Sequence, residues 1–311
     1  DRDNLRAVIE GPDPDTSLRV AAGLIRFFAN RGHWHEGRTL LDRALATADH
    51  PPSVVLAKAL LGAGHLAVSQ GDFPAAARLL GQARDTARIA GDPHLEATVA
   101  NVEGEAARLQ GDASAAEAHY RAALRGAEDA GDDRLVAMAR NNLGLLAYER
   151  GDGPAAAAEW EVARAAAARI GDAAGEMRAA SNLGLVAQQA GDLTRARSFF
   201  ETALRLAEAA GNRRGQAAAT NNLGTVLAAA GDIAAAAPVL VTAARMFEEM
   251  GDTEALAQNL LNQAAASTGG EAAVPLLRRA AALYRQLGNE ELAAAIDEDR
   301  RTFEPTTDAG G

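Results

Sequence analysis

The sequence predicts an all-α protein made of repeated helix pairs, and two observations lead to this prediction. Hydrophobic residues make up 48% of the 311 residues but aromatic residues only 4%, and alanine is the most frequent of the hydrophobic residues. Small residues of high helix propensity favour closely packed helices over sheets. In addition, a glycine followed by Asp or Asn recurs every twenty residues along most of the chain. A fixed period of this kind is typical of a repeat protein.

Each recurring glycine is predicted to end one helix, and the Asp or Asn after it to begin the next. Glycine adopts the left-handed conformation found just beyond a helix C-terminus, and an Asp or Asn side chain caps a helix N-terminus. One helix therefore fills each interval between turns. The glycines at this spacing are Gly71, Gly91, Gly111, Gly131, Gly151, Gly171, Gly191, Gly211, Gly231 and Gly251, and Gly288 continues the series after a slip.

Alternate intervals differ, so the repeating unit is two helices in forty residues. The first helix carries a Leu-Gly pair, as at Leu143-Gly144 and Leu183-Gly184. The second carries a small, a large and a small residue at i, i+4 and i+7, which lie on one helix face. The small residues let helices approach closely, and the large one is expected to fill the space between neighbouring units. The large residues of successive units are Leu41, Leu80, Tyr120, Trp160, Phe200, Leu240 and Leu277.

Leu-Gly in the first helix and Ala-x3-(aromatic or Leu)-x2-Ala in the second resemble the tetratricopeptide repeat (TPR), here lengthened to forty residues. The longer form is similar to the repeats of spindle-orientation adaptors and bacterial peptide-pheromone receptors. The resemblance covers roughly residues 15–303 and implies a right-handed TPR α-solenoid of about seven helix-turn-helix repeats. A capping helix is expected after Asn289, and residues 304–311 are expected to form a disordered tail.

The N-terminal segment suggests the setting of these repeats. Residues 1–14 are expected to form a lone helix, "DRDNLRAVIE", and a linker, "GPDP". Together with "RGH" and "EGR" further on, this segment resembles the start of the TPR region in bacterial STAND regulators (signal-transduction ATPases with numerous domains) of the LuxR and AfsR types. The resemblance implies a nucleotide-binding module upstream of the repeats. The chain has no initiator Met, and we expect it to be part of a longer polypeptide.

The same resemblance places a ligand groove on the first helices, which line the concave surface of a TPR solenoid. With Leu-Gly packed against the partner helix, the residue before Leu and its neighbours at i−4, i−1 and i+3 are expected to face the groove. The candidate ligand-binding residues are Asn101, Met138, Asn141, Asn142, Leu145, Arg178, Asn182, Leu185, Asn221, Asn222 and Asn259.

Asn142, Asn182, Asn222 and Asn259 are expected to form a ladder of carboxamides along this groove. A carboxamide is both donor and acceptor and therefore matches the backbone of any peptide. Related TPR proteins hold an extended peptide through this asparagine, and the resemblance implies the same role here. One alternative is that each asparagine bonds to the adjacent repeat and fixes only the stacking. Another is that the asparagines are inherited from the repeat consensus and face a solvated groove. Arg178 likewise fits either a ligand carboxylate or a surface salt bridge.

Other patterns do not support catalysis, and we expect no catalytic site, cofactor or metal. Cysteine is absent, which excludes thiol chemistry and Cys-based metal sites. The histidines of "HWHE" (residues 33–36) are two apart in a turn and do not share a face. "GAGHLA" (residues 62–67) lies within a predicted helix and not after a strand, which argues against a nucleotide loop. Glu103 and Glu105 are expected to point to different faces and make a poor acid–base pair.

Charge and hydropathy limit the partners further. A net charge of −11 disfavours direct contact with nucleic acid, and no apolar run is long enough for a membrane span. We therefore expect a cytoplasmic, non-enzymatic domain that binds a protein or peptide, as the sensor or interaction region of a larger bacterial signalling or transcriptional regulator. Occupancy of the groove would shift the activity of the attached module. The alternatives are self-association, an autoinhibitory scaffold without an external ligand, and an adaptor or chaperone-like module.

Overall fold

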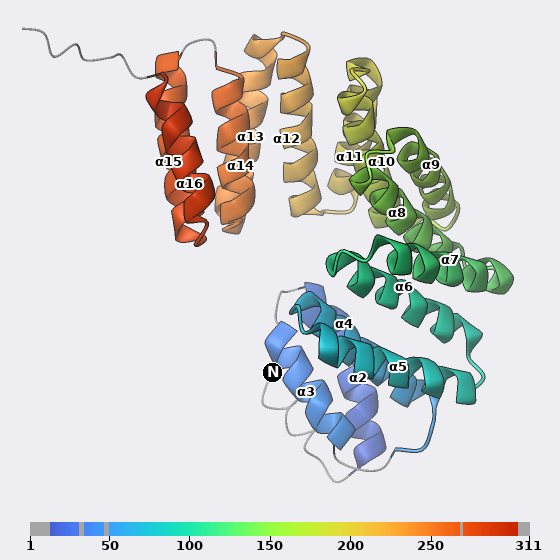
Figure 1. The fold of residues 1–311 in the computed structure, drawn as a ribbon. Helices are drawn as coiled ribbons and strands as arrows, with labels where there is room; N and C mark the ends of the chain where they lie inside the picture. The colour runs from blue at the N-terminus through green and yellow to red at the C-terminus, as the bar shows by residue number, and fades with distance from the viewer. Residues whose placement is uncertain (1–12, 31–33, 47–49, 268–269, 304–311) are drawn as a thin grey trace, which may run out of the picture. The chain divides into compact units, whose positions relative to one another are not determined.

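The computed structural model describes residues 13–30, 34–46, 50–267 and 270–303, which form helices joined by short turns and include no strand (Figure 1). The chain divides into two compact units, unit 1 (Asp1–Ile170) and unit 2 (Gly171–Gly311). The predicted lone helix of residues 1–10 and the predicted tail of residues 304–311 lie outside the described residues.

The helices of each unit pack as consecutive antiparallel pairs, as the forty-residue period predicts. In every pair the first helix makes its most extensive contact with the second, and the second then packs on the first helix of the next pair in the same unit. Unit 1 contains α2 (Pro14–Asn30), α3 (Trp34–Ala46), α4 (Val54–Ser69), α5 (Phe73–Ile89), α6 (Pro93–Leu109), α7 (Ala113–Ala130), α8 (Asp133–Glu149) and α9 (Gly153–Arg169).

Unit 2 continues the pattern and ends in a single additional helix. It contains α10 (Ala173–Gln189), α11 (Leu193–Ala209), α12 (Arg213–Ala229), α13 (Ile233–Met250), α14 (Thr253–Ala265), α15 (Gly270–Gln286) and α16 (Glu290–Arg301). The described residues therefore form seven helix pairs followed by the predicted capping helix, which packs on α15. The prediction of an all-α helical-repeat fold is confirmed.

The turns have the predicted backbone conformation. All eleven recurring glycines have φ between 62° and 83°, a left-handed conformation that side chains with a Cβ rarely adopt. No other described residue has a positive φ. The Asp or Asn that follows caps the next helix through its side chain; the Asp112 carboxylate, for example, accepts from the Ala115 amide at 2.9 Å. Each turn is therefore fixed by its own two residues.

The Leu-Gly glycine of each first helix lies against the large residue of the second. A Cβ added to Gly144 would come within 2.6 Å of the Trp160 ring, and one added to Gly184 within 2.5 Å of the Phe200 ring. The same relation joins Gly104 to Tyr120. Trp160, Phe200 and Tyr120 are all at most 1% exposed. The predicted close approach of the paired helices is therefore present, and only glycine leaves room for it.

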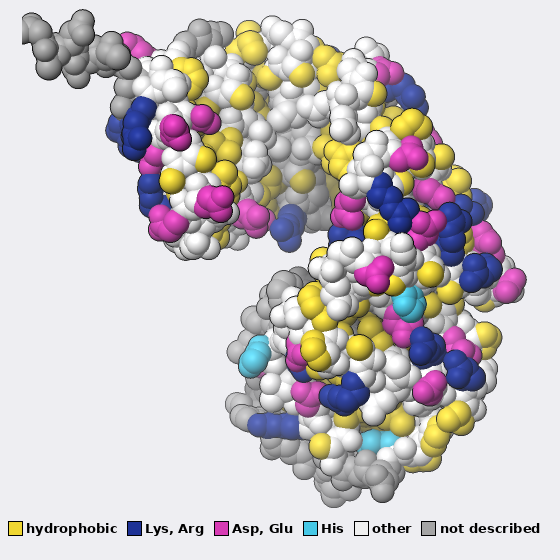
Figure 2. All heavy atoms as spheres, in the orientation of Figure 1, with side chains coloured by type: hydrophobic (Ala, Val, Ile, Leu, Met, Phe, Trp, Pro, Cys, Tyr) yellow, Lys and Arg dark blue, Asp and Glu magenta, His cyan; other side chains and the backbone are white. Residues whose placement is uncertain are grey.

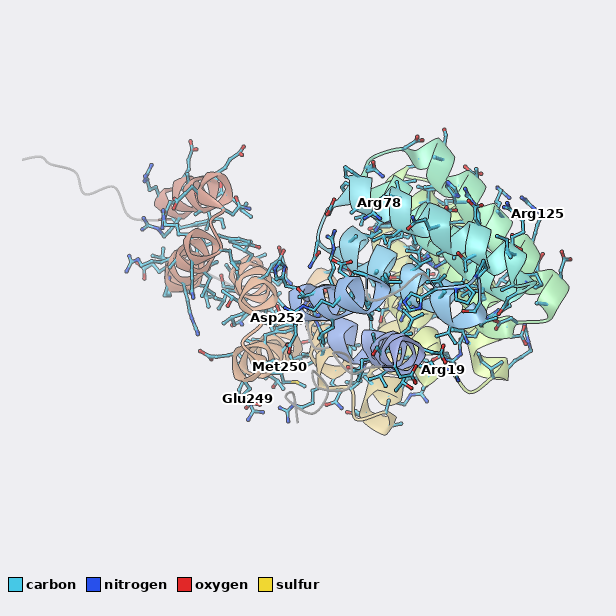
Figure 3. The ribbon with its side chains drawn as sticks, turned by 90° about the horizontal axis from the view of Figure 1, so that it is seen from below. Arg19, Arg78, Arg125, Glu249, Met250 and Asp252 are labelled. Carbon is cyan, nitrogen blue, oxygen red and sulfur yellow. The ribbon has the colours of Figure 1, made fainter. Side chains whose placement is uncertain are left out.

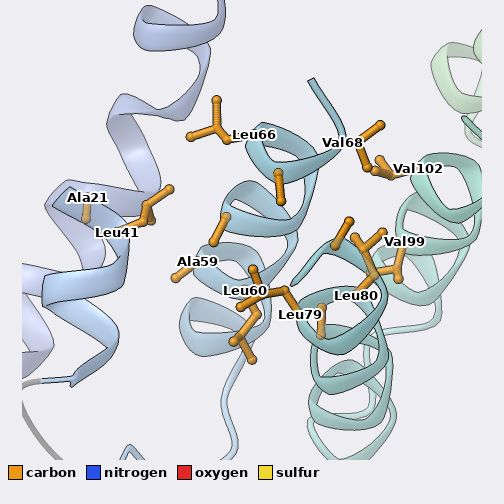
Figure 4. Close-up of a cluster of buried hydrophobic side chains, with 14 of the residues drawn as sticks. Ala21, Leu41, Ala59, Leu60, Leu66, Val68, Leu79, Leu80, Val99 and Val102 are labelled. Atoms are coloured by element: carbon orange, nitrogen blue, oxygen red, sulfur yellow. The ribbon is translucent and has the colours of Figure 1, made fainter. Parts of the chain in front are cut away.

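The buried side chains of neighbouring pairs in unit 1 form clusters that extend across several helices. Figure 4 shows the cluster that runs from α2 to α6, in which Leu41, Leu66 and Leu80 are almost completely buried. Leu79 and Val99 belong to the same cluster. Each repeat thus shares its core with the next, which is why a single pair would not be stable alone.

The first helices lie closer to one another than the second helices do. In unit 1, α4 contacts α2 and α6, and α6 contacts α8, whereas no contact of similar extent joins α5 to α7 or α7 to α9 within the described residues. In unit 2, α10 contacts α12 in the same way. Within each unit the surface made by the exposed side chains of the first helices is therefore the inner one. We call it the first-helix face.

Ion pairs supplement this packing on the surface of unit 1, where Figure 2 shows acidic and basic side chains intermixed. The Arg150 guanidinium reaches back to the Glu117 carboxylate of α7 at 2.6 Å, and Arg169 of α9 pairs with Asp133 of α8 at 2.5 Å. Hydrogen bonds from Arg150 and Arg121 lower the pKa of Glu117, and one from Arg169 lowers the pKa of Asp133. Both carboxylates therefore favour the folded state when ionised.

These lowered pKa values predict that unit 1 loses stability in acid. A carboxyl group with a pKa below its unfolded value of 4.5 stabilises the fold above that pH, and the contribution disappears as the pH falls through the folded-state pKa. Thermal unfolding followed by circular dichroism should therefore show a melting temperature that drops between pH 6 and pH 3. The drop should be smaller in Glu117→Gln, which has already lost this carboxylate.

Glu161→Gln is the matched control, because Glu161 pairs with Arg164 only one turn away on the same helix, at 3.0 Å. Its melting temperature at pH 7 should be close to that of the unsubstituted protein, because the lost pair lies within one helix and joins no neighbouring helices. If the melting temperature of Glu117→Gln fell between pH 6 and pH 3 as much as that of the unsubstituted protein, the stabilising role assigned to the Glu117 carboxylate would be contradicted.

Candidate functional site

The first-helix face of unit 1 combines exposed apolar side chains with amides. Met138 is 38% exposed, and Asn142 and Leu145 on the same helix are half-buried. Two contacts between successive first helices mark this face, from His65 of α4 to Glu105 of α6 at 3.7 Å and from Arg108 of α6 to Glu149 of α8 at 2.7 Å.

Leu109, at the end of α6, was not predicted as a site residue although it is 47% exposed. It lies one helical turn beyond Glu105, a residue that contacts a neighbouring first helix. Extending the predicted row of groove-facing residues by four positions along α6 would have included Leu109.

Two of the candidate asparagines in unit 1 are buried, which differs from the groove position expected from the sequence. Asn101 and Asn141 are 3% and 9% exposed. Asn142 Nδ2 donates to Asn101 Oδ1 in the preceding repeat at 3.0 Å, and the Asn141 carbonyl accepts from Trp160 Nε1 at the same distance. Burial of these polar groups is possible because each has a partner. Asn142 thus connects repeats, as the stacking interpretation proposes, and is still half-exposed.

On the first-helix face of unit 2, one candidate ligand-binding residue is charged and the others are neutral. Arg178 is exposed, Leu185 is 37% exposed, and Asn182, Asn221 and Asn222 are half-buried. No ion pair joins Arg178 to any residue in the described part of the chain. The surface salt bridge that the sequence allowed for Arg178 is therefore not formed with the described residues.

Asn259 differs most from its expected position, because it is completely buried. Its Nδ2 donates to the Leu240 carbonyl of α13 at 3.1 Å and to Asn221 Oδ1 of α12 at 2.9 Å. Its Oδ1 accepts from Gln263 Nε2 at 2.6 Å. The sequence equated Asn259 with Asn222, but counted from the capping residues Asp252 and Asn212, Asn259 takes the place of the buried Ala219, and Asn262 is the residue that matches Asn222.

Asn262 and Gln263 join this network and were not predicted. Asn262 Nδ2 donates to Asn221 Oδ1 at 3.1 Å. Both residues lie within one turn of Asn259 on α14, so the spacing that shares a helix face would have identified them. Unit 2 therefore has a polar layer between α12 and α14 whose outer edge is Asn222.

The glutamates considered for acid–base chemistry form ion pairs within the fold. Glu103 contacts Arg84 of α5 at 3.0 Å and His119 of α7 at 3.3 Å, whereas Glu105 contacts His65 of α4. The two glutamates therefore point to different faces, as predicted. In the described ranges no cluster of three or more His, Asp or Glu side chains is arranged to hold a metal ion, while His33 lies outside them.

Open depressions occur elsewhere on each unit. One of about 600 Å³ in unit 1 is lined by side chains that include Arg38, His50 and Arg78. One of about 480 Å³ in unit 2 lies at the turn between α13 and α14, beside Met250 and Asp252 (Figure 3). Neither includes a candidate residue of the first-helix faces. Every helix in the described part of the chain is too short or too polar to cross a membrane.

The chain resembles several solved structures at the level of the fold. A Signal Transduction ATPase with Numerous Domains (STAND) protein with a tetratricopeptide repeat sensor, from Pyrococcus horikoshii, is 13% identical, with a TM-score of 0.69. The match covers 96% of this chain and 52% of that one, so the chain spans about half of that protein. A Rap protein complexed with Competence and Sporulation Factor is 15% identical, with a TM-score of 0.67 and coverage of 97% and 89%.

BtubC from P. vanneervenii is 21% identical, with a TM-score of 0.57, and the match covers 79% of this chain and 92% of that one. No curated protein matches the sequence. Residues 175–249, in unit 2, match the family model of the tetratricopeptide repeat. Residues 175–249 are therefore tetratricopeptide repeats, and helix pairs of the same design extend over the described residues on either side of them.

Proposed function

We propose that this chain is a non-catalytic module that binds a protein or peptide segment on its first-helix faces. The observation that carries the proposal is the combination of exposed apolar side chains and half-buried amides on these faces. Met138 and Asn142 provide it in unit 1, and Leu185 and Asn222 in unit 2. A monomeric domain gains no stability from such exposed apolar groups, whereas a bound segment would bury them.

The chemistry of the faces suits an extended peptide. Amide groups donate to and accept from a peptide backbone regardless of its sequence. Met138 in unit 1 and Leu185 in unit 2 are each exposed, so each can anchor an apolar side chain of a peptide bound to its own unit. Apolar anchors of this kind supply much of the binding energy in protein interfaces. The overall charge of −11 makes nucleic acid an unfavourable partner.

The comparisons support the same proposal. The Rap structure contains Competence and Sporulation Factor, and the repeats of the STAND protein are described as a sensor. By extension, we propose that this chain is the sensor or interaction region of a larger bacterial signalling regulator, acting in the cytoplasm. Binding would then change the activity of an attached module by stabilising one of its conformations.

The test is direct selection of binding peptides from a random library, followed by calorimetry with the selected sequences. Leu185→Glu and Met138→Glu are expected to weaken binding by about tenfold or more for peptides that use the corresponding face, because each buries an unpaired charge on binding. Val241→Glu on α13 and Val162→Glu on α9 are matched controls, since both valines are exposed on second helices, at 56% and 43%.

If the first-helix and second-helix substitutions weakened peptide binding equally, the proposed location of the binding face would be contradicted. Concentration-dependent mass in light scattering without any peptide, lost in the first-helix variants only, would instead support self-association through the same residues.

A further inference from the structure

A depression of about 600 Å³ separates the second helices α3 and α5 of unit 1, and the first helix α4 forms its floor. Both second helices pack on α4, and no contact of similar extent joins them to each other within the described residues. We call this depression the outer groove. It is open to solvent and contains none of the candidate residues of the first-helix face.

The floor of the outer groove is apolar. Leu60 of α4 and Leu79 of α5 are 7% and 3% exposed and lie in the same buried cluster (Figure 4). Leu45 of α3 and Leu56 of α4 also line the groove and are half-buried. A molecule in the groove would therefore remove the exposed parts of these leucines from water.

The same place one repeat later is filled by an ion-pair network. Counted from the large residue of each second helix, Leu45 and Leu79 correspond to Arg84 and His119. Both of these side chains contact the Glu103 carboxylate of α6, at 3.0 and 3.3 Å. The network thereby links α5 to α7 through the first helix that lies between them.

A second ion-pair network occupies the place after that. Glu159 of α9 takes the position of Leu79 in its repeat and lies 3.0 Å from the Arg140 guanidinium of α8. Arg140 also reaches Glu128 of α7 at 3.2 Å. Leucine side chains cannot form such links. The outer groove between α3 and α5 therefore lacks the polar filling that the next two grooves of unit 1 contain.

One buried polar side chain in the outer groove has no partner. Thr86 of α5 lines the groove and is 9% exposed, and its hydroxyl makes no hydrogen bond to any residue in the described part of the chain. By contrast, the Thr202 and Thr242 hydroxyls donate to the carbonyl four residues earlier, at 3.0 and 2.8 Å. A buried hydroxyl without a partner is unfavourable, and an oxygen atom of a bound molecule would satisfy it.

The charges around the outer groove cancel. Arg38 lies 2.7 Å from the Asp72 carboxylate and 3.7 Å from that of Asp42. Arg78, labelled in Figure 3, adds a second positive charge at the rim. His50 Nε2 donates to a backbone carbonyl at 3.0 Å. Because two arginines face two carboxylates, an ionic ligand would gain little attraction here and would still lose its hydration.

We propose that the outer groove binds a small uncharged organic molecule with an apolar body and a carbonyl or hydroxyl oxygen. The apolar body covers Leu45 and Leu56, and the oxygen accepts from the Thr86 hydroxyl. The volume of the groove lies within the range of about 300–1,000 Å³ that is usual for small-molecule sites, which combine an apolar lining with few polar groups. This site is independent of the peptide binding proposed for the first-helix faces.

The experiment compares three probes that share a phenylbutyl body: 4-phenylbutanamide, which is uncharged, the 4-phenylbutanoate anion and the 4-phenylbutylammonium cation. Each is titrated into the full chain with 13C-labelled leucine methyl groups, observed by NMR. The amide should shift the methyl signals of Leu45 and Leu56 with a dissociation constant of about 1 mM or tighter, as expected for a ligand of this size. Each ion should bind at least about threefold more weakly, because its lost hydration is not compensated.

Thr86→Val keeps the shape of the side chain and removes its hydroxyl. The variant should bind 4-phenylbutanamide about two- to tenfold more weakly, the usual effect of one hydrogen bond. Its thermal stability should be unchanged or higher, because the lost hydroxyl has no partner in the fold. Thr98→Val is the matched control, since Thr98 is exposed on α6 and donates to the His94 carbonyl at 2.9 Å.

Leu45→Arg places a charge over the apolar floor and should abolish the binding of 4-phenylbutanamide. The proposal is overturned if none of the probes moves the Leu45 and Leu56 signals, or if the two ions bind as tightly as the amide. Unchanged affinity in Thr86→Val would overturn the assignment of the hydroxyl. Peptide binding to the first-helix faces should be the same with and without the amide, so failure of either function is recognised separately.

Discussion

Replacing Trp160 with alanine is expected to destabilise unit 1 by about 3–5 kcal/mol, the usual cost of removing a large buried aromatic side chain. Trp160 is 1% exposed, lies against Gly144 and donates from Nε1 to the Asn141 carbonyl at 3.0 Å. Its removal leaves a cavity between α8 and α9 and takes a hydrogen bond from a buried carbonyl. The loss is therefore expected at the upper end of the range for point substitutions.

Urea unfolding measures the size of this effect, and hydrogen exchange locates it. Protection should fall first in α8 and α9, because a helical repeat is stabilised by its own pair and its immediate neighbours. Val162→Ala on the same helix is the control, since Val162 is 43% exposed and its truncation should change stability by at most about 0.5 kcal/mol. Similar losses in both variants would show that Trp160 does not occupy the core of the pair.

Gly184→Ala is expected to destabilise unit 2 by about 1–2 kcal/mol, although alanine is the better helix former by up to about 1 kcal/mol. The added Cβ would lie 2.5 Å from Cε1 of Phe200 and 2.8 Å from two further ring atoms. Phe200 is 0% exposed, so its ring has no free space to move into. The steric cost of separating α10 from α11 therefore outweighs the gain in helix propensity.

Gly81→Ala provides a matched comparison of opposite sign. Gly81 lies inside α5, and no atom outside its own helix lies within 4 Å of an added Cβ there. The substitution should raise stability by a few tenths of a kcal/mol up to about 1 kcal/mol. Chemical denaturation of the two single variants measures the change in the free energy of unfolding for each. A gain in stability for Gly184→Ala would contradict the proposed contact between glycine and ring.

The fold could be predicted from the sequence because its determinants are local and repeated. A left-handed glycine and a capping Asp act within one turn, and each recurrence confirms the others. The pairing of Gly144 with Trp160 was predictable in kind for the same reason, since a small and a large residue at matching places in every repeat imply contact. Neither inference required knowledge of distant parts of the chain.

The candidate site was less predictable because it depends on partners from other helices. Asn259 was expected to occupy the place of Asn222 in the repeat, yet Asn222 is half-exposed and Asn259 is completely buried. Counted from the capping residues Asn212 and Asp252, the match of Asn222 is Asn262. Asn259 takes the place of the buried Ala219, where the Leu240 carbonyl receives its amide. Similarly, only the three-dimensional structure could show that Arg178 lacks an ion pair with the described residues.

The role of the Leu240 carbonyl has a consequence for how this protein tolerates mutation. A main-chain oxygen persists whatever side chain is encoded at its position, so codon changes at residue 240 cannot reverse the polarity of Asn259. Asn259 donates to Asn221, whose Nδ2 donates to Asn222 Oδ1 at 3.3 Å. Substitutions of side chains in α13 therefore leave the orientation of the Asn222 amide unchanged. Only substitutions of Asn221, Asn222, Asn259 or their direct neighbours can alter it. Homologues that retain these three asparagines are expected to keep the same orientation of the Asn222 amide even where the outer helices have diverged.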